Sequence, residues 1–282
     1  MGKNTEWQHS ALALDKTGVL SRRQIAEVIG VARSTCLDFL REYGKFKDDG
    51  ATTQEVEPEH DNSRILVISD LHAPYCHPNT LQFLQMLKDR YNPTRIISVG
   101  DEQDVSASSF HDSDPDLLSA GHELVKAQLF MQELYKMFPR MDIMSSNHGD
   151  LYYRKAKHHG IPLHVIKSYN DVLRVGDGWK WHNDLTIELP NGQSVYFCHG
   201  KAANGLKLSQ SLGMSCVQGH YHNSCNIQYW SSPRELHWSM QVGCLIDDKS
   251  LAMAYNKLTV NRPIISCGLI IDSVPVLEMM PL

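Results

Sequence analysis

Residues 64–72 read Arg-Ile-Leu-Val-Ile-Ser-Asp-Leu-His, an apolar run that ends abruptly in acidic and histidine side chains. A short apolar run rich in β-branched residues predicts a buried strand, and the polar residues after it predict a loop. The same pattern recurs farther along the chain. We therefore predict strands over residues 65–69, 96–99, 143–145, 195–198 and 216–218.

Helical patterns lie between the first of these strands. Apolar residues recur at helical spacing over residues 80–90 and again over 122–138. Pro190-Asn191-Gly192 predicts a β-hairpin, and a second hairpin is predicted over 263–279. Strands that alternate with helices predict an α/β (α+β) fold, in which helices cover a sheet and function lies in the loops that leave the strand ends.

The composition is that of an ordinary globular protein. With 282 residues, 42% of them hydrophobic and 21% charged, the chain is long enough for one sizeable core and a small additional domain. Residues 1–10 are polar, and no apolar run approaches the roughly 20 residues of a membrane span. We expect a protein of the cytoplasm, in a bacterial cell or a phage-infected host, with no membrane partner. The seven cysteines form no Cys-x-x-Cys pair, so we expect reduced thiols.

Charge divides the chain into three parts. Residues 1–47 contain eight Lys and Arg against five Asp and Glu, although the whole chain has a net charge of −5. Residues 48–61 contain six acids and no Lys or Arg, a composition that buries too little apolar surface to fold. We predict a domain over 1–47, an acidic linker over 48–62 and a larger domain over 63–282.

The first domain carries the pattern of two short helices. Ser21 and Gln24 form a capping box, Gly30 supplies a break, and a second helix is predicted over about 33–42. Residues 21–35 resemble the helix-turn-helix of resolvase-like and phage DNA-binding modules. That resemblance implies DNA contacts from Arg22, Arg23, Arg33, Ser34 and Thr35. A helical bundle that docks onto a protein partner is the alternative.

Side chains that bind metals follow nearly every predicted strand of the larger domain. One Asp-x-His or His-x-His has little weight, because a loop histidine is usually solvated or hydrogen-bonded. Five ligand-rich loops at strand ends would converge on one edge of one sheet, so we predict a metal centre there. In chain order the loops read Asp70-Leu-His72, Gly100-Asp101-Glu-Gln-Asp104, Asn147-His148, His199-Gly200 and Gly219-His220-Tyr-His222.

The mixture of carboxylate, amide and imidazole groups indicates the kind of metal and reaction. It suits borderline metals, with manganese expected first and iron or zinc as alternatives, whereas an all-oxygen set would favour magnesium or calcium. A phosphate ester resists attack by water because its oxygens are already anionic. Two divalent ions about 3.5 to 4 Å apart neutralise these oxygens, lower the pKa of a bound water and align its attack.

These loops, in this order, resemble the calcineurin-like metallophosphoesterase family over residues 64–271. The resemblance implies a β-sandwich flanked by helices and a hydrolase that acts on phosphate esters. It implies one ion held by Asp70, His72, Asp101 and His222, and a second held by Asp101, Asn147, His199 and His220. It also implies that His148 protonates the leaving group or stabilises the transition state, with Asp104 holding its ring.

The sequence departs from the family pattern beside two of these loops. Ser146 and Gly149 flank the Asn-His pair, where the family has Gly and an acidic residue. After Asp104, Val-Ser-Ala replaces the Arg-Gly with which serine/threonine protein phosphatases bind phosphate, which argues against that activity. Arg154 and His77 are the candidate substitutes for this phosphate contact. Residues 238–262 resemble the C-terminal part of phage and bacterial members, and we expect them to form a lid or rim.

The two domains together predict a DNA nuclease. A basic helix-turn-helix tethered to a metal site would raise the local concentration of DNA there. The alternative is a phosphatase or cyclic-nucleotide phosphodiesterase on a small substrate, with the N-terminal helices docking a partner. A DNA-binding regulator without activity is disfavoured, because the set of ligand residues is complete.

Overall fold

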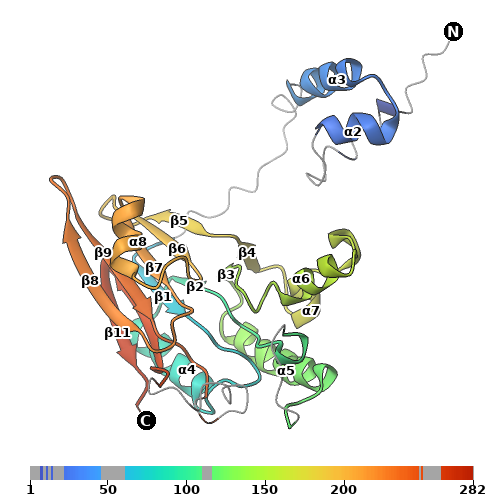
Figure 1. Ribbon diagram of the computed structural model, residues 1–282. Helices are drawn as coiled ribbons and strands as arrows, with labels where there is room; N and C mark the ends of the chain where they lie inside the picture. Colours follow the sequence, from blue (N-terminus) through green and yellow to red (C-terminus); the bar gives the residue numbers. More distant parts are fainter. Residues whose placement is uncertain are drawn as a thin grey trace. The chain divides into compact units, whose positions relative to one another are not determined.

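The computed structural model describes residues 7, 8, 11, 14, 22–45, 61–109, 116–247, 249 and 262–281. The chain divides into two compact units, Met1–Glu59 and His60–Leu282. Figure 1 shows the helices of the first unit and the two sheets of the second. Most of the predicted acidic linker, residues 48–60, lies outside the described residues.

Helices α2 (Arg22–Ile29) and α3 (Arg33–Lys45) form the main described part of the first unit. Gly30 between them has a φ of +72°, a left-handed conformation that glycine adopts without steric cost. Ile25, Ala26, Cys36 and Leu40 are buried together, so the two helices pack through a small apolar core. The two predicted helices are present, and their contact with DNA stays a prediction.

The second unit contains two mixed sheets, of which the first has six strands in the order β11-β10-β1-β2-β3-β4. Strands β1 to β4 run parallel, whereas β10 and β11 form an antiparallel hairpin beside β1. The strands are β1 (Arg64–Ile68), β2 (Arg95–Ser98), β3 (Met141–Met144), β4 (Trp179–His182), β10 (Ser266–Ile271) and β11 (Val274–Met279).

The second sheet has five strands in the order β5-β6-β7-β9-β8. Strands β6, β7 and β9 run parallel, and β5 and β8 pair antiparallel at the two edges. The hairpin predicted around Pro190-Asn191-Gly192 joins β5 to β6. The strands are β5 (Leu185–Glu188), β6 (Ser194–Cys198), β7 (Ser215–Gln218), β8 (Cys225–Ser231) and β9 (Leu236–Val242).

Helices cover the outer faces of both sheets. Helices α4 (Thr80–Tyr91) and α5 (Ala120–Met137) pack on the first sheet, and α8 (Gly205–Leu212) packs on the second (Figure 1). Successive residues of a strand point to opposite faces. Ile65 and Val67 therefore meet the second sheet, while Leu66 and Ile68 meet the helices. The predicted β-sandwich flanked by helices is confirmed.

Short helices lie in the loops of the second unit. They are η2 (Ser106–Ser108), α6 (Leu151–His158), η3 (Leu163–Val165) and α7 (Tyr169–Leu173). No helix in the described ranges combines the length and the apolar character that a bilayer crossing requires.

The expectation of a lid is wrong for the first part of residues 238–262. Residues 238–242 belong to β9, which lies between β7 and β8 in the second sheet. Trp238, Met240 and Val242 alternate along β9 and fill the core between the sheets, which is the pattern of an inner strand. Residues 248 and 250–261 lie outside the described residues.

Candidate metal centre

The predicted ligands lie in loops that leave the ends of parallel strands. Strands β1, β2 and β3 are neighbours in the first sheet, and β6 and β7 are neighbours in the second. The N–H of His72 donates to the carbonyl of Asp101 at 2.8 Å, which joins the loops after β1 and β2. The N–H of His220 donates to Oδ2 of Asp70 at 2.9 Å, which joins the loops of the two sheets.

Four of the seven predicted ligands have a left-handed backbone. Their φ angles are +49° at Asp70 and at His72, +54° at Asp101 and +70° at His220. For residues other than glycine this conformation costs about 1 to 3 kcal/mol each and persists only where the surrounding structure imposes it. Strain of this kind concentrates at functional sites. Four of the nine described non-glycine residues with positive φ are predicted ligands, which favours a functional site at this edge of the sheets.

Asp70, His72 and His222 form a first cluster of ligand atoms. Nε2 of His222 lies 3.1 Å from Oδ1 of Asp70 and 3.2 Å from Nε2 of His72. Nε2 of His72 also lies 3.6 Å from Oδ2 of Asp101. The structure thus brings together the four residues predicted for the first ion.

Asp101, His199 and His220 form a second cluster. Nε2 of His199 lies 3.1 Å from Oδ2 of Asp101, 2.7 Å from Oδ1 of Asn147 and 3.2 Å from Nδ1 of His220. Nδ1 of His199 donates to the carbonyl of Val99 at 2.9 Å, so the Nε2 lone pair of the neutral ring faces the cluster. The four residues predicted for the second ion therefore also lie together.

The chemistry of these groups fits a cation. In neutral His199, the Nε2 lone pair and the oxygens of Asn147 and Asp101 all offer electron pairs, and they repel one another unless a proton or a metal ion lies among them. Oδ2 of Asp101 is buried and, within the described part of the chain, has no hydrogen-bond partner when His199 is neutral. A buried carboxylate oxygen without a partner is costly. Because one histidine nitrogen from each cluster approaches this oxygen, it has the position of a bridging ligand.

The closeness of the ligands shifts their pKa values. Burial opposes ionisation of Asp70 and Asp101, but the facing histidines outweigh it and hold the pKa of both carboxyl groups below the usual range. Burial likewise disfavours the charged form of His199, yet the charge of Asp101 raises the pKa of His199 to about 9. His220 behaves differently, since burial and the neighbouring His199 lower its pKa. Such groups exchange protons for metal ions when they bind them.

The Asp104 carboxylate lies closer to His72 than to the predicted His148. Its Oδ1 lies 2.7 Å from Nδ1 of His72 but 3.6 Å from Nδ1 of His148. The ring of His148 instead donates from Nδ1 to the backbone carbonyl of Asp104. The Asp104 carboxylate therefore orients His72, and its role in holding His148 stays a prediction. The loop after β1 lies close to Asp104, whose N–H donates to the carbonyl of Ala73 at 3.1 Å.

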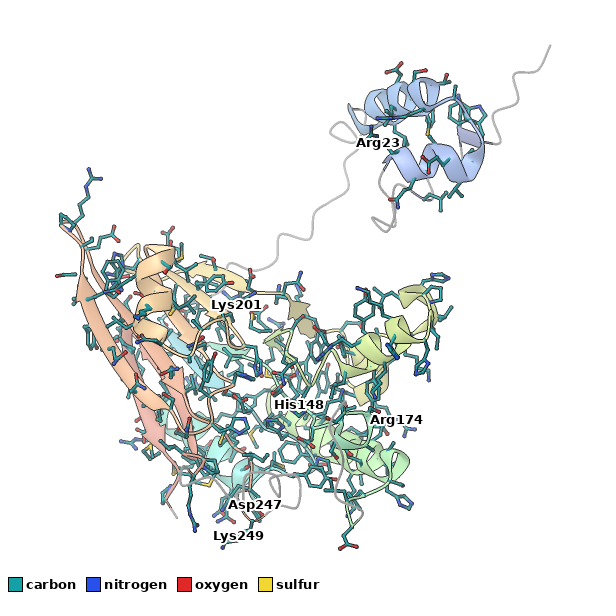
Figure 2. All side chains as sticks on the ribbon, in the orientation of Figure 1. Arg23, His148, Arg174, Lys201, Asp247 and Lys249 are labelled. Atoms are coloured by element: carbon teal, nitrogen blue, oxygen red, sulfur yellow. The ribbon has the colours of Figure 1, made fainter. Side chains whose placement is uncertain are left out.

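His148 forms a third group of possible ligand atoms with His72 and Asp101. Its N–H donates to Oδ1 of Asp101 at 3.1 Å, and its ring meets the ring of His72 edge-on at 4.6 Å. Its side chain is 24% exposed, and Figure 2 labels it near the middle of the second unit. Because Nδ1 is hydrogen-bonded to the main chain, Nε2 is the ring nitrogen that a substrate can meet.

Glycines allow the loops to approach this closely. A Cβ at Gly219 would overlap the hydroxyl of Ser69 and the carboxylate of Asp70. A Cβ at Gly100, where φ is +106°, would lie 2.7 Å from Nδ1 of His199. Any larger residue at these two positions would displace a ligand.

The two candidate phosphate contacts, His77 and Arg154, lie on different elements. His77 lies in the turn before α4, where its Nδ1 accepts the N–H of Asn79 at 3.2 Å. It belongs to none of the clusters of ligand atoms. Arg154 is exposed on α6. Its contact with phosphate stays a prediction.

The sequence pattern missed two groups that support Asp70. The hydroxyl of Ser69 donates to Oδ2 of Asp70, and the N–H of Leu245 donates to its carbonyl at 3.0 Å. Ser69 ends a predicted strand, and Leu245 lies far along the chain. No motif could have assigned either of them to the site.

No family model matches the sequence, and none of the curated proteins matches it. Solved phosphoesterases resemble it in fold. An archaeal phosphodiesterase has 12% identity and a TM-score of 0.43, with 77% of this chain and 99% of that chain covered. Yfce, a phosphoesterase from E. coli, has 13% identity and a TM-score of 0.41, with coverage of 75% and 90%. The nuclease MPE of Pseudomonas putida has 11% identity and a TM-score of 0.32, with coverage of 76% and 87%.

These neighbours are named as a phosphodiesterase, a phosphoesterase and a nuclease. At such low identity the likeness concerns the fold alone. The assignment of roles in this chain therefore depends on its own geometry.

Proposed function

We propose that this chain is a two-metal phosphoesterase that cuts phosphodiester bonds, with DNA as its substrate. The observation that carries the proposal is the position of Asp101 Oδ2. When His199 is neutral, this buried oxygen has no hydrogen-bond partner among the described residues, and it lies 3.1 Å from Nε2 of His199 and 3.6 Å from Nε2 of His72. A carboxylate oxygen between two sets of nitrogen and oxygen ligands is placed to serve both ions of a dinuclear centre.

In this proposal seven residues hold the two ions, and His148 transfers a proton. Two divalent ions, with manganese expected first, would neutralise the phosphate oxygens and lower the pKa of a water at the centre. One ion would be held by Asp70, His72 and His222, the other by Asn147, His199 and His220, and both by Asp101. In its doubly protonated form, His148 keeps its Nδ1 hydrogen bond and can donate the Nε2 proton to the leaving oxygen.

The first unit supports DNA as the substrate. Arg33, Ser34 and Thr35 are exposed in the first turn of α3, and Arg23 is exposed on α2 (Figure 2). In a helix-turn-helix, residues at the start of the second helix contact base edges. The side chain of Arg22 lies outside the described residues.

A manganese-dependent activity panel tests the proposal. Its substrates are single- and double-stranded DNA oligonucleotides, RNA, cyclic nucleotides and phosphopeptides. We expect cleavage of DNA by the wild type and by Asp89→Asn, an exposed carboxylate on α4, but not by Asp101→Asn. Intact DNA together with turnover of cyclic nucleotides or small monoesters would favour the alternative of a small-substrate phosphatase or phosphodiesterase.

A further inference from the structure

A basic segment follows the metal centre directly in the chain. Residues 151–174 contain five Lys and Arg and a single acid, Asp171, whereas the whole chain has a net charge of −5. The segment comprises α6, η3 and α7. It is therefore a cationic region on a protein of the opposite net charge.

The segment begins at the catalytic edge of the sheets and leads away from it. The N–H of Leu151 donates to the carbonyl of His148 at 3.1 Å, so α6 starts where the Asn-His loop ends. Helix α6 also packs against η2, the turn that follows Asp104. Figure 1 shows α6 and α7 to one side of the unit, apart from α4 and α8. With eight residues, α6 extends about 12 Å from the centre.

Large apolar side chains are exposed in the same segment. The exposed fractions are 45% for Ile161, 57% for Leu163 and 61% for Val165. Exposed apolar side chains that gather together indicate an interaction surface. A surface that combines cations with exposed apolar groups fits a polyanion that also offers flat apolar faces, and nucleic acid has this chemistry.

We propose that residues 151–167 form a nucleic-acid-binding arm. Lys157 and Lys167, both exposed, contact phosphates of the strand whose ester lies at the metal centre, and Leu163 and Val165 pack against its bases. At about 3.4 Å per nucleotide, the length of α6 corresponds to three or four steps of one strand. This inference rests on the proposed function, since it assigns the surface that guides DNA to that same site.

Substitution of the arm lysines tests the inference in the full-length protein. The test variant is Lys157→Gln with Lys167→Gln, and the matched control is Lys136→Gln with Lys207→Gln, exposed lysines of α5 and α8. The readout is the ratio of kcat/KM for a DNA oligonucleotide to kcat/KM for a small aryl phosphodiester, with manganese, over a range of salt concentrations. The ratio cancels any general effect on the metal centre.

We expect the ratio to fall about tenfold in the arm variant and to keep its wild-type value in the control. The logarithm of the ratio should decline less steeply with the logarithm of the salt concentration, with the magnitude of the negative slope smaller by about 1.4 to 1.8, the contribution of two phosphate contacts. Leu163→Ser with Val165→Ser should lower the ratio without changing this slope, because no charge is removed.

Failure of the arm and failure of the proposed function give different results. If the wild type cuts DNA and the arm variant keeps the wild-type ratio and slope, the inference is overturned and the proposed function stands. If the wild type hydrolyses the aryl diester but not DNA, the proposed function fails. Photocrosslinking to an iodouracil-containing oligonucleotide then tests whether residues 151–167 bind nucleic acid. Labelled peptides from residues 151–167 support it, and labels found only elsewhere overturn it.

Discussion

Oδ1 of Asp104 lies 2.7 Å from Nδ1 of His72. Asp104 is not a predicted metal ligand, but its carboxylate orients His72, which is one. The hydrogen bond fixes the proton of neutral His72 on Nδ1 and leaves the Nε2 lone pair facing Asp101 and His222. Carboxylates that hold metal-binding histidines in this way raise the basicity of the ligand and fix the direction of its ring.

Removal of the Asp104 carboxylate should therefore weaken metal binding. We expect Asp104→Ala to lower the affinity for Mn²⁺ about 10- to 100-fold in a metal titration, with Asp104→Asn between it and the wild type because the amide oxygen still accepts a hydrogen bond. Wild-type affinity combined with a large loss of kcat would mean that Asp104 serves His148 alone.

Replacement of His148 should affect turnover and spare the metals. His148→Gln keeps the backbone N–H that donates to Asp101 and removes only the ring, which is not a predicted ligand, so the metal content should stay at the wild-type value. We expect kcat on DNA to fall about 100-fold or more, as for other general acids. The loss should be smaller for an aryl diester whose leaving group needs no proton. Loss of metal would show instead that the imidazole is a ligand.

Gly219 should tolerate no side chain. In Gly219→Ala the new Cβ meets the carboxylate of Asp70 and the hydroxyl of Ser69, so we expect weaker metal binding and a lower melting temperature. The control is Gly121→Ala in α5, where a Cβ meets nothing within 4 Å. Equal metal affinity in the two variants would contradict the close packing at Asp70.

Metal binding should release protons. The pKa of His199 is raised to about 9 by Asp101, against the effect of burial, so in the absence of metal the ring is protonated at pH 7.5. An ion that takes its Nε2 must displace that proton, and the apparent affinity should rise about tenfold per pH unit for each proton displaced, until pH passes about 9. Calorimetry in buffers of different ionisation enthalpy measures this release. Binding without proton release would exclude His199 as a ligand.

The same shift sets the sign of a stability effect in the protein without metal. The pKa of His199 is higher in the folded chain than the ordinary value of 6.5, so its protonation stabilises the fold most fully below that pH. The contribution is lost as pH rises through about 9. Thermal melts of the EDTA-treated protein between pH 6 and 10 should therefore show falling stability that added manganese offsets.

The strands that precede the ligand loops could be predicted because each is largely buried and contains consecutive apolar residues. Strand β4 was missed because its sequence, Trp-Lys-Trp-His, is short and half polar. Strand β8 was missed because it lies at an edge of its sheet with most of its side chains partly exposed. Strand β4 pairs with β3, which is distant in sequence, whereas β8 forms a hairpin with the next strand, β9; neither has an apolar pattern strong enough to reveal it.

The types and order of the ligand residues could be read from the sequence, but not every contact among them. Asp104 lies within reach of both His72 and His148, and the sequence gives no reason to choose between them. Packing of the loop after β1 against the loop after β2 brings His72, rather than His148, closest to the Asp104 carboxylate. The support of Asp70 by Leu245 likewise arises only from the fold, because the two residues are far apart in the chain.

Metal content per chain tests the central claim most directly. The protein is stripped with chelator, reloaded with manganese, freed of excess ion and assayed by mass spectrometry of the metal, for the wild type and for Asp101→Asn. A bridging Asp101 predicts two ions per chain in the wild type and the loss of both in the variant, because one carboxylate belongs to both sites. One ion or none in the wild type, or an unchanged content in Asp101→Asn, would contradict the dinuclear centre.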